Sequence, residues 1–307
     1  MTPAISVAGL TRGYRGHLAL DRVTFDVERG SITGLLGRNG AGKTTLLRIL
    51  AGQEFPSAGQ VRVFGASPAE NDQVLRRMVL IREDQVYPDF KVRHALAAAS
   101  WCYPGWSSEL ASSLLADFGL PPDRPVKKLS RGMRSALGIV TGLAARAELT
   151  LFDEPYAGLD AVARQTFYDR LLADYAEHPR TILLSTHLID EAAGLLERVI
   201  VMDRGRVVLA AAADDLRGIA TTVSGPVLAV DDFSAGHEVW DRRQIASQAS
   251  VVMVGPLGEG DWARARSLRL DLEPLTLQQL VVHAAAQPAE TTNAGSFAAA
   301  AMERTSA

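Results

Sequence analysis

A glycine-rich segment at residues 37–45, GRNGAGKTT, has the residue types and spacing of a phosphate-binding loop. Gly37 and Gly42 bracket it, because a backbone that closely approaches phosphate oxygens needs conformations that a Cβ would hinder. Lys43 has the reach and charge for the β- and γ-phosphates, and the Thr44 hydroxyl suits Mg²⁺. The segment therefore predicts binding of ATP with Mg²⁺. The residues expected to hold the nucleotide are Gly37, Arg38, Asn39, Gly40, Ala41, Gly42, Lys43, Thr44 and Thr45.

Two acidic residues end an apolar run at 149–155, LTLFDEP. If this run is a buried strand, Asp153 and Glu154 lie at the carboxyl edge of the sheet, where open α/β folds bind ligands. Asp153 would then hold Mg²⁺ through its water shell, and Glu154 would orient and deprotonate the water that attacks the γ-phosphate. Taken alone, the same residues fit a strand followed by an acidic helix cap equally well. The phosphate-binding segment upstream favours the catalytic interpretation.

The segments around these residues have the periodicity needed to position them. Residues 31–36, SITGLL, are typical of a buried strand and residues 44–51 have helical spacing, so the phosphate-binding segment lies between a strand and a helix. Alternating apolar residues at 22–27 indicate a half-buried strand. Further strands are expected at 149–152, 181–185 and 199–202, and helices at 161–175 and 189–196. This order of strands and helices predicts an α/β layered sheet.

The composition of the chain changes twice along its length. Between residues 86 and 146 strand signals fade and Ala- and Leu-rich helical patterns dominate, which indicates an inserted helical subdomain. After about Leu216 short apolar runs alternate with turn residues, which indicates a small second domain. We therefore expect an ATP-binding domain at 1–216, an accessory α+β domain at 217–288 and a disordered tail, rich in small and polar residues, at 289–307.

The bulk composition argues against several classes of protein. The net charge of the 307 residues is −3, which provides no broad basic field for nucleic acid, so no nucleic-acid partner is expected. Cys102 is the only cysteine, which excludes an internal disulfide framework and a cysteine-cluster metal site. No run of about 18 apolar residues occurs and the first residues lack a basic segment followed by an apolar core. We expect a cytoplasmic protein that does not itself span a membrane.

Three further motifs stand around FDEP: LSRGM at 129–133, AGLD at 157–160 and STH at 185–187. Together with the phosphate-binding segment they resemble the ATP-binding subunits of ABC transporters, over about residues 5–213. The resemblance implies a P-loop NTPase core with an antiparallel β subdomain and an inserted helical subdomain. It also implies that two such domains close head to tail, so that each ATP lies between the phosphate loop of one and the LSGGQ-type signature of the other.

Three residues match positions at the interface between the two domains of that family. Ser130 and Gly132 match signature residues that contact the γ-phosphate from the opposite chain, although LSRGM alone would be a helix N-cap with a basic first turn. Asp160 matches the acid that crosses the dimer and links the two sites, and it also suits the N-cap of the helix that begins at Ala161. The resemblance thus adds Ser130, Gly132 and Asp160 to the nucleotide site.

Two more residues match positions within one domain. His187 matches the histidine that contacts the γ-phosphate and positions the water beside Glu154, whereas a single histidine after a strand is otherwise mostly structural. Tyr14 stands where the family stacks an aromatic ring on adenine, but it also fits an exposed position in the turn-like sequence RGYRG.

The chain departs from the family pattern at two places. In the signature, Arg131 replaces a glycine and Met133 replaces a glutamine, and Arg131 either adds a cation near phosphate or faces solvent. Where the family has a strand followed by a metal-contacting glutamine, this chain offers Glu83 or Gln85. The count back from the Tyr-Pro pair that follows favours Glu83, whose carboxylate can bind the metal or its water.

The resemblance implies an ATPase that drives a separate membrane-spanning permease, and the lone ATP-binding chain with LSRGM favours export. The second ATP-binding chain is either a copy of this chain or a paralogue. Residues 86–103 would contact the permease, which would hold the protein on the inner face of the cell membrane. The alternative is a soluble ABC-type ATPase with an assembly or regulatory role and no transport. The cargo is not encoded here, because its pathway lies in the partner.

Overall fold

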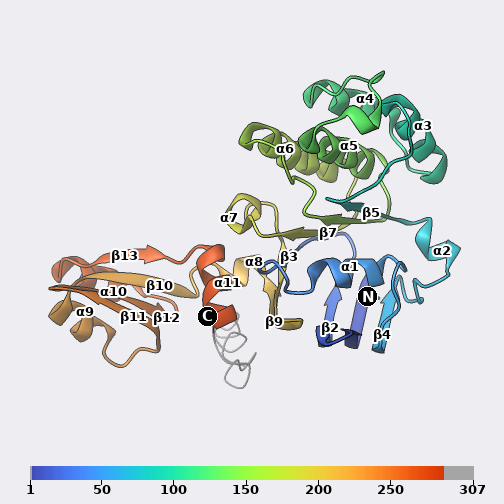
Figure 1. Ribbon diagram of the computed structural model, residues 1–307. Coiled ribbons are helices and arrows are strands. Elements are labelled where there is room, and N and C mark those ends of the chain that lie inside the picture. The colour runs from blue at the N-terminus through green and yellow to red at the C-terminus, as the bar shows by residue number, and fades with distance from the viewer. Residues whose placement is uncertain (1, 287–307) are drawn as a thin grey trace. The chain divides into compact units, whose positions relative to one another are not determined.

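A six-stranded sheet forms the centre of the first of two units in the computed structural model, which describes residues 2–286 (Figure 1). The first unit runs to Leu188 and includes Gly194–Ala210, whereas the second takes Ile189–Ala193 and the chain from Ala211 onward. The disordered tail predicted for 289–307 lies outside the described residues. No helix among residues 2–286 is long and apolar enough to cross a membrane.

The strand order of this sheet is β5-β6-β7-β3-β8-β9, and the first five strands run parallel. In the same order the strands are Met78–Arg82, Leu149–Asp153, Thr181–Thr186, Ile32–Leu36, Arg198–Asp203 and Arg206–Ala212. Every residue of β3, β6 and β7 is buried. Their near-continuous apolar runs are therefore those of strands covered on both faces.

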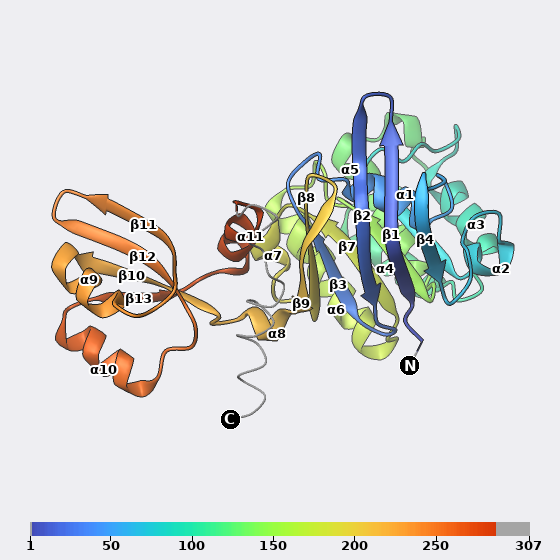
Figure 2. The same cartoon turned by 90° about the horizontal axis from the view of Figure 1, so that it is seen from below.

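An antiparallel sheet of three strands, ordered β2-β1-β4, covers one side of this core (Figure 2). Its strands are β1 (Ile5–Tyr14), β2 (His17–Val27) and β4 (Ala58–Val63). The helix α1 (Lys43–Leu50) contributes Leu46, Leu47 and Leu50 to a buried cluster shared with both sheets. This cluster fixes the helix that carries Lys43 and the end of the phosphate-binding segment.

Helices cover the opposite side of the six-stranded sheet (Figure 1). The helix α5 (Arg131–Ala144) lies close to β5 and β6, and Gly142 permits this close approach. A Cβ at Gly142 would lie 2.8 Å from Ile81 and 2.7 Å from Phe152. On its other side Phe152 packs edge-on against Phe167 of α6, with ring centroids 5.4 Å apart. Besides α1, the helices of this unit are α2 (Asp72–Leu75), α3 (Val92–Cys102), α4 (Ser108–Asp117), the 3₁₀ helix η1 (Val126–Lys128), α5 (Arg131–Ala144) and α6 (Ala161–Glu177).

One predicted helix is shorter than its periodicity indicated. The pattern at 189–196 predicts a helix of eight residues, but α7 (Ile189–Ala192) ends four residues earlier. Gly194 follows in a turn, and glycine lowers helix stability by about 1 kcal/mol relative to alanine. The apolar residues Leu195 and Leu196 are buried without being helical.

The second unit contains a four-stranded antiparallel sheet of order β11-β12-β10-β13. Along the chain its elements are β10 (Ala220–Pro226), α9 (Val227–Ser234), β11 (Val239–Ile245), β12 (Gln248–Val254), α10 (Glu259–Ser267) and β13 (Asp271–Pro274). This order is that of the split βαβ fold, in which two helices cover one face of the sheet. Val223, Val251 and Met253 point into the core beside Phe233 of α9. The short α8 (Ala213–Leu216) precedes this sheet and α11 (Leu277–Ala286) follows it.

Candidate nucleotide site

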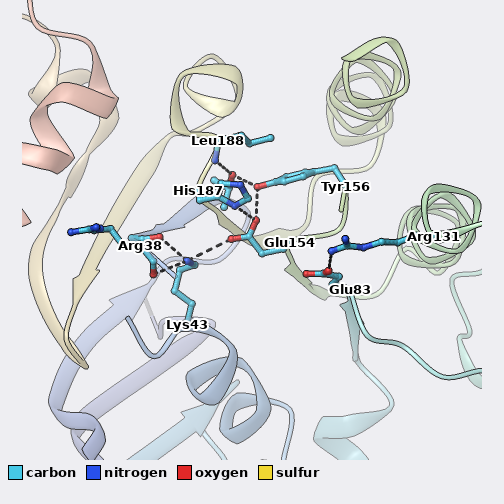
Figure 3. Close-up of polar contacts among 10 residues, drawn as sticks. Arg38, Lys43, Glu83, Arg131, Glu154, Tyr156, His187 and Leu188 are labelled. Carbon is cyan, nitrogen blue, oxygen red and sulfur yellow. Dashed lines mark hydrogen bonds and ion pairs between the residues drawn. The ribbon is translucent and has the colours of Figure 1, made fainter. Parts of the chain in front are cut away.

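Three neighbouring strands, β6, β7 and β3, end at the same edge of the six-stranded sheet. The phosphate-binding segment follows β3, Glu154 follows β6, and His187 follows β7. Because parallel strands bring their carboxyl ends to one edge, the structure places these three parts of the chain together (Figure 3). The phosphate-binding segment lies more than 100 residues before Glu154, and His187 lies 33 residues after it, so their proximity is a property of the strand order.

The phosphate-binding loop depends on two glycines that accept no side chain. Gly37 has φ 150° and a Cβ there would lie 2.3 Å from the carbonyl oxygen of Met202. Gly42 has φ 101° and a Cβ there would lie 2.5 Å from the carbonyl oxygen of Ala19. The Lys43 side chain is 6% exposed, and its Nζ donates to the Gly37 carbonyl at 2.6 Å. The loop thus holds a buried ammonium against its own carbonyl groups at the start of α1.

Asp153 is buried at the end of β6 beside the loop. Burial raises the pKa of its carboxyl above the ordinary value of 3.8, and the neighbouring hydroxyls of Thr44 and Ser185 oppose that shift. Its Oδ1 atom is buried without a hydrogen-bond partner. Within the described residues no cluster of three or more His, Cys, Asp or Glu side chains forms a complete metal site. An orphaned carboxylate oxygen beside a threonine hydroxyl fits an Mg²⁺ ion that completes its shell with water and phosphate oxygens.

Glu154 occupies a strained turn between Lys43 and His187. Its φ is 48°, in the left-handed region that is sparsely populated by residues other than glycine. The Oε1 atom lies 3.5 Å from Lys43 Nζ, and the Oε2 atom lies 2.6 Å from His187 Nδ1 (Figure 3). The carboxylate therefore bridges the phosphate loop and the end of β7, and the strained backbone is what directs it there.

The structure adds Tyr156, which the sequence analysis missed, to this group. The Tyr156 side chain is buried, and its hydroxyl donates to Glu154 Oε2 at 3.0 Å and contacts Thr186 Oγ1. Its ring centroid lies 6.3 Å from that of His187. The only signal in the sequence was a tyrosine two residues after the candidate base, which by itself indicates a core residue.

Ser130, Gly132 and Asp160 form a second group, at the N-termini of α5 and α6. Ser130 caps α5 by accepting a hydrogen bond from the Met133 N–H at 3.2 Å, and Asp160 caps α6 through the Ala163 N–H at 2.8 Å. A Cβ on Gly132 would lie 2.4 Å from the Gly158 carbonyl oxygen, so LSRGM and AGLD pack directly against each other. All three residues line a cavity of about 370 Å³ that is separate from the group around Lys43.

The remaining candidates have partners of other kinds. The Tyr14 hydroxyl donates to Glu54, and the Arg12 guanidinium lies 4.7 Å from the centre of the Tyr14 ring. The Glu83 carboxylate pairs with Arg131 at the start of α5 (Figure 3), and Oε1 of Gln85 is buried without a hydrogen-bond partner. Both Glu83 and Gln85 lie just beyond β5, next to the strand that carries Asp153.

The fold and the site together define a P-loop nucleotide-binding protein of α/β architecture. Residues 20–157 match the family model described as ABC transporter. The chain is 36% identical over 212 residues to the Nod factor export ATP-binding protein I of Ralstonia nicotianae, an alignment that covers 67% of this chain and 66% of that protein. The chain thus spans just under two thirds of the length of that relative.

Two other relatives are named for drug resistance and for import. The daunorubicin/doxorubicin resistance ATP-binding protein DrrA of Streptomyces peucetius is 34% identical, with 70% of this chain and 67% of that protein covered. The aliphatic sulfonates import ATP-binding protein SsuB 3 of Paraburkholderia xenovorans is 35% identical, with 66% of this chain and 78% of that protein covered. A solved structure of the ATP-binding subunit of an ABC transporter superposes with a TM-score of 0.63, at 29% identity, covering 70% of this chain and 92% of the other. The chain belongs to the ABC transporter family, as an ATP-binding subunit.

Proposed function

We propose that this protein hydrolyses ATP and that Glu154 is the general base. The observation that carries the proposal is the bridging position of the Glu154 carboxylate, with one oxygen 3.5 Å from Lys43 Nζ and the other 2.6 Å from His187 Nδ1. A carboxylate beside the phosphate-binding lysine is placed to orient a water and to accept its proton. His187, with a half-exposed side chain, holds that carboxylate from the solvent side and reaches the γ-phosphate.

The other residues of the site bind and orient the substrate. Lys43 leaves the Gly37 carbonyl to contact the β- and γ-phosphates, while the first-turn N–H groups of α1 face the phosphates. Thr44 and Asp153 would hold Mg²⁺, which neutralises phosphate charge when it is bound. The remaining loop residues, Arg38, Asn39, Gly40, Ala41, Gly42 and Thr45, line the phosphates, and Tyr14 stacks on adenine. Stacking on adenine requires that Tyr14 expose a face of its ring, and the Tyr14 residue is 43% exposed.

We place the complete site between two chains. Ser130, Gly132 and Asp160 line their own cavity, whose lining includes neither Lys43 nor Glu154 nor His187, and a second ATP-binding chain would supply the phosphate loop that covers it. The N-terminus of α5, a helix of 14 residues, would direct its dipole at the γ-phosphate of the other chain. The second chain is either a copy of this one or a paralogue.

The proposed partner outside the dimer is a membrane-spanning permease, which would hold this chain on the inner face of the membrane. Val86 and Phe90, in the loop between β5 and α3, and Trp101, near the end of α3, are exposed, Val86 by 87% and Trp101 by 85%. Several large exposed apolar side chains in one stretch of chain favour a docking surface for another protein. We propose export as the direction, because two of the similar proteins are named for export and drug resistance.

Co-purification with a membrane protein tests this function as a whole. The full chain is expressed with the membrane proteins of its host, solubilised in mild detergent, and assayed for MgATP hydrolysis with and without the captured partner. We expect slow hydrolysis by the chain alone and a changed rate in the complex. An ATPase that is fully active and captures no membrane protein would instead support the soluble alternative, and a chain with no hydrolysis in either state would refute both.

A further inference from the structure

Tyr156 lies at the centre of a hydrogen-bonded group that joins the ends of β6 and β7. Its side chain is 3% exposed and its ring packs against that of Tyr168, with centroids 6.4 Å apart. Its hydroxyl meets Glu154 Oε2 from one side and Thr186 Oγ1 from the other. The ring therefore fixes the hydroxyl between the candidate base and the residue that precedes His187.

The hydroxyl has one proton and faces two acceptors. Thr186 Oγ1 already accepts a hydrogen bond from the Leu188 N–H at 2.8 Å. Glu154 carries a full negative charge when ionised, and hydrogen bonds to ionised acceptors are about twice as strong as neutral ones. Burial raises the pKa of Tyr156 well above its ordinary value, so the hydroxyl keeps its proton at working pH. The Tyr156 hydroxyl thus donates its hydrogen bond to Glu154 rather than to Thr186.

Two donors converge on the same oxygen of Glu154, but their surroundings differ. His187 Nδ1 approaches Oε2 from a side chain that is 50% exposed, whereas the Tyr156 ring is held in the core. The exposed donor can leave to follow a bound phosphate, and the buried donor cannot. The other carboxylate oxygen, Oε1, has Lys43 Nζ at 3.5 Å and no hydrogen bond (Figure 3).

We propose that Tyr156 is a positioning residue, whose hydroxyl holds Glu154 Oε2 so that Oε1 faces the attacking water throughout the cycle. This inference rests on the proposed function, because it assigns a role to Tyr156 only if Glu154 is the base. The Glu154 carboxylate is then held in two ways, by the left-handed backbone at Glu154 and by the hydrogen bond from the Tyr156 hydroxyl. Geometric errors of about 1 Å in such a group cost on the order of 100-fold in rate.

Tyr156→Phe tests the proposal, since it removes one oxygen and keeps the ring. The matched control is Tyr175→Phe, which deletes a hydroxyl that likewise faces two acceptors, the Gly30 carbonyl and the Glu197 carboxylate, in the same unit. We expect Tyr156→Phe to lower kcat for MgATP by about 10-fold or more, with KM within about twofold of the parent. The control is expected to keep kcat unchanged. Rates are measured at a temperature at which circular dichroism shows all variants folded.

A double-mutant cycle separates positioning from a defect in folding. Hydrolysis of labelled ATP is followed over hours in Glu154→Gln and in Glu154→Gln with Tyr156→Phe. We expect the same residual rate in both, because a positioning residue has no effect once the group it positions is gone. An equal loss in both backgrounds would show a structural role and overturn the proposal. If Tyr156→Phe has the same kcat as the parent, the positioning role of Tyr156 is refuted while the proposed ATPase function stands. If the parent itself does not hydrolyse ATP, the proposed function is refuted.

Discussion

Glu83, at the end of β5, and Arg131, in the first turn of α5, form an ion pair across 48 residues of sequence (Figure 3). The Glu83 N–H also donates to the Asp153 carbonyl at 3.2 Å, so the pair stands beside the end of β6. Arg131 stands where the family signature has a glycine, and Glu83 is the residue that we favour over Gln85 for the position where the family has a glutamine. With Glu83 at that position, the two departures from the family pattern contact each other.

If Thr44 and Asp153 hold Mg²⁺ as proposed, this ion pair draws the Glu83 carboxylate away from the ion, so loss of the pair should change the Mg²⁺ dependence of hydrolysis. The two side chains are 41% and 64% exposed, and exposed pairs contribute about 0.2–1 kcal/mol. We expect Arg131→Ala to lower the Mg²⁺ concentration for half-maximal hydrolysis by up to about fivefold, which is the same free energy expressed as a ratio. The control is Arg134→Ala, one turn further along α5. An unchanged Mg²⁺ dependence in Arg131→Ala would argue that Glu83 is not part of the metal site.

Replacement of the proposed base should separate binding from hydrolysis. In Glu154→Gln the side chain keeps its shape but cannot accept a proton, and a general base contributes about 10²- to 10⁴-fold to the rate. We expect hydrolysis to fall by at least about 100-fold while ATP binding persists and an ATP-bound dimer accumulates on size exclusion. Glu177→Gln, at the exposed end of α6, is the matched control. Normal turnover in Glu154→Gln would refute the assignment of the base.

Asp153 predicts a pH dependence of stability in the absence of nucleotide. Because burial raises its pKa in the folded state, the folded protein is destabilised as pH rises from 3.8 through the raised value. Asp153→Asn removes that penalty, so we expect it to unfold at a higher temperature than the parent at pH 7.5, with the difference vanishing near pH 3.8. The same variant should lose the added stability that MgATP gives the parent. If the parent and Asp153→Asn unfold at the same temperature at pH 7.5, burial of the ionised Asp153 carboxylate does not destabilise the folded protein.

Much of the site was predictable because neighbouring parallel strands must share a carboxyl edge. The positions of Lys43, Glu154 and His187 follow from three buried apolar runs and the residues that end them. The contacts of Tyr156 with Thr186 and of Glu83 with Arg131 were not predictable, since each depends on packing between distant segments rather than on local spacing.

The strands of the three-stranded sheet were also harder to predict than the buried strands of the six-stranded sheet. In β1 the pairing register shifts between Val7 and Leu10, where Gly9 has φ 59°, and this interrupts the alternation of apolar residues. The predicted strand at 22–27 is the second half of β2, whose first residues are exposed. Periodicity identifies strands that are buried throughout more reliably than strands that are bulged or partly exposed.

Lys43 should contribute to nucleotide binding itself. Its ammonium is buried beside the loop carbonyls, and a hydrogen bond to a charged group contributes about 1.5–3 kcal/mol. We expect Lys43→Ala to weaken ATP binding by about 10- to 100-fold in equilibrium titration. Lys43→Arg is expected to fail too, because the planar guanidinium does not fit where a compact ammonium is buried. If Lys43→Ala binds ATP as tightly as the parent, the phosphate-loop interpretation is wrong.

A mixture of two inactive variants tests whether the second chain is a copy of this one. Ser130→Asp keeps an acceptor for the Met133 N–H, since aspartate is a good N-cap, but it puts a negative charge opposite the γ-phosphate of the other chain.

Alone, Ser130→Asp and Lys43→Ala should each be inactive, because every site of either homodimer lacks one half. In an equal mixture that exchanges subunits, half of the dimers contain both variants and each of these has one intact site, so about a quarter of the parent's sites return. We expect the ATPase rate of the mixture to rise well above that of either variant. No recovery, with exchange verified by differently tagged chains, would mean that the shared site needs a paralogue, and full activity of Ser130→Asp alone would mean that Ser130 does not face ATP at all.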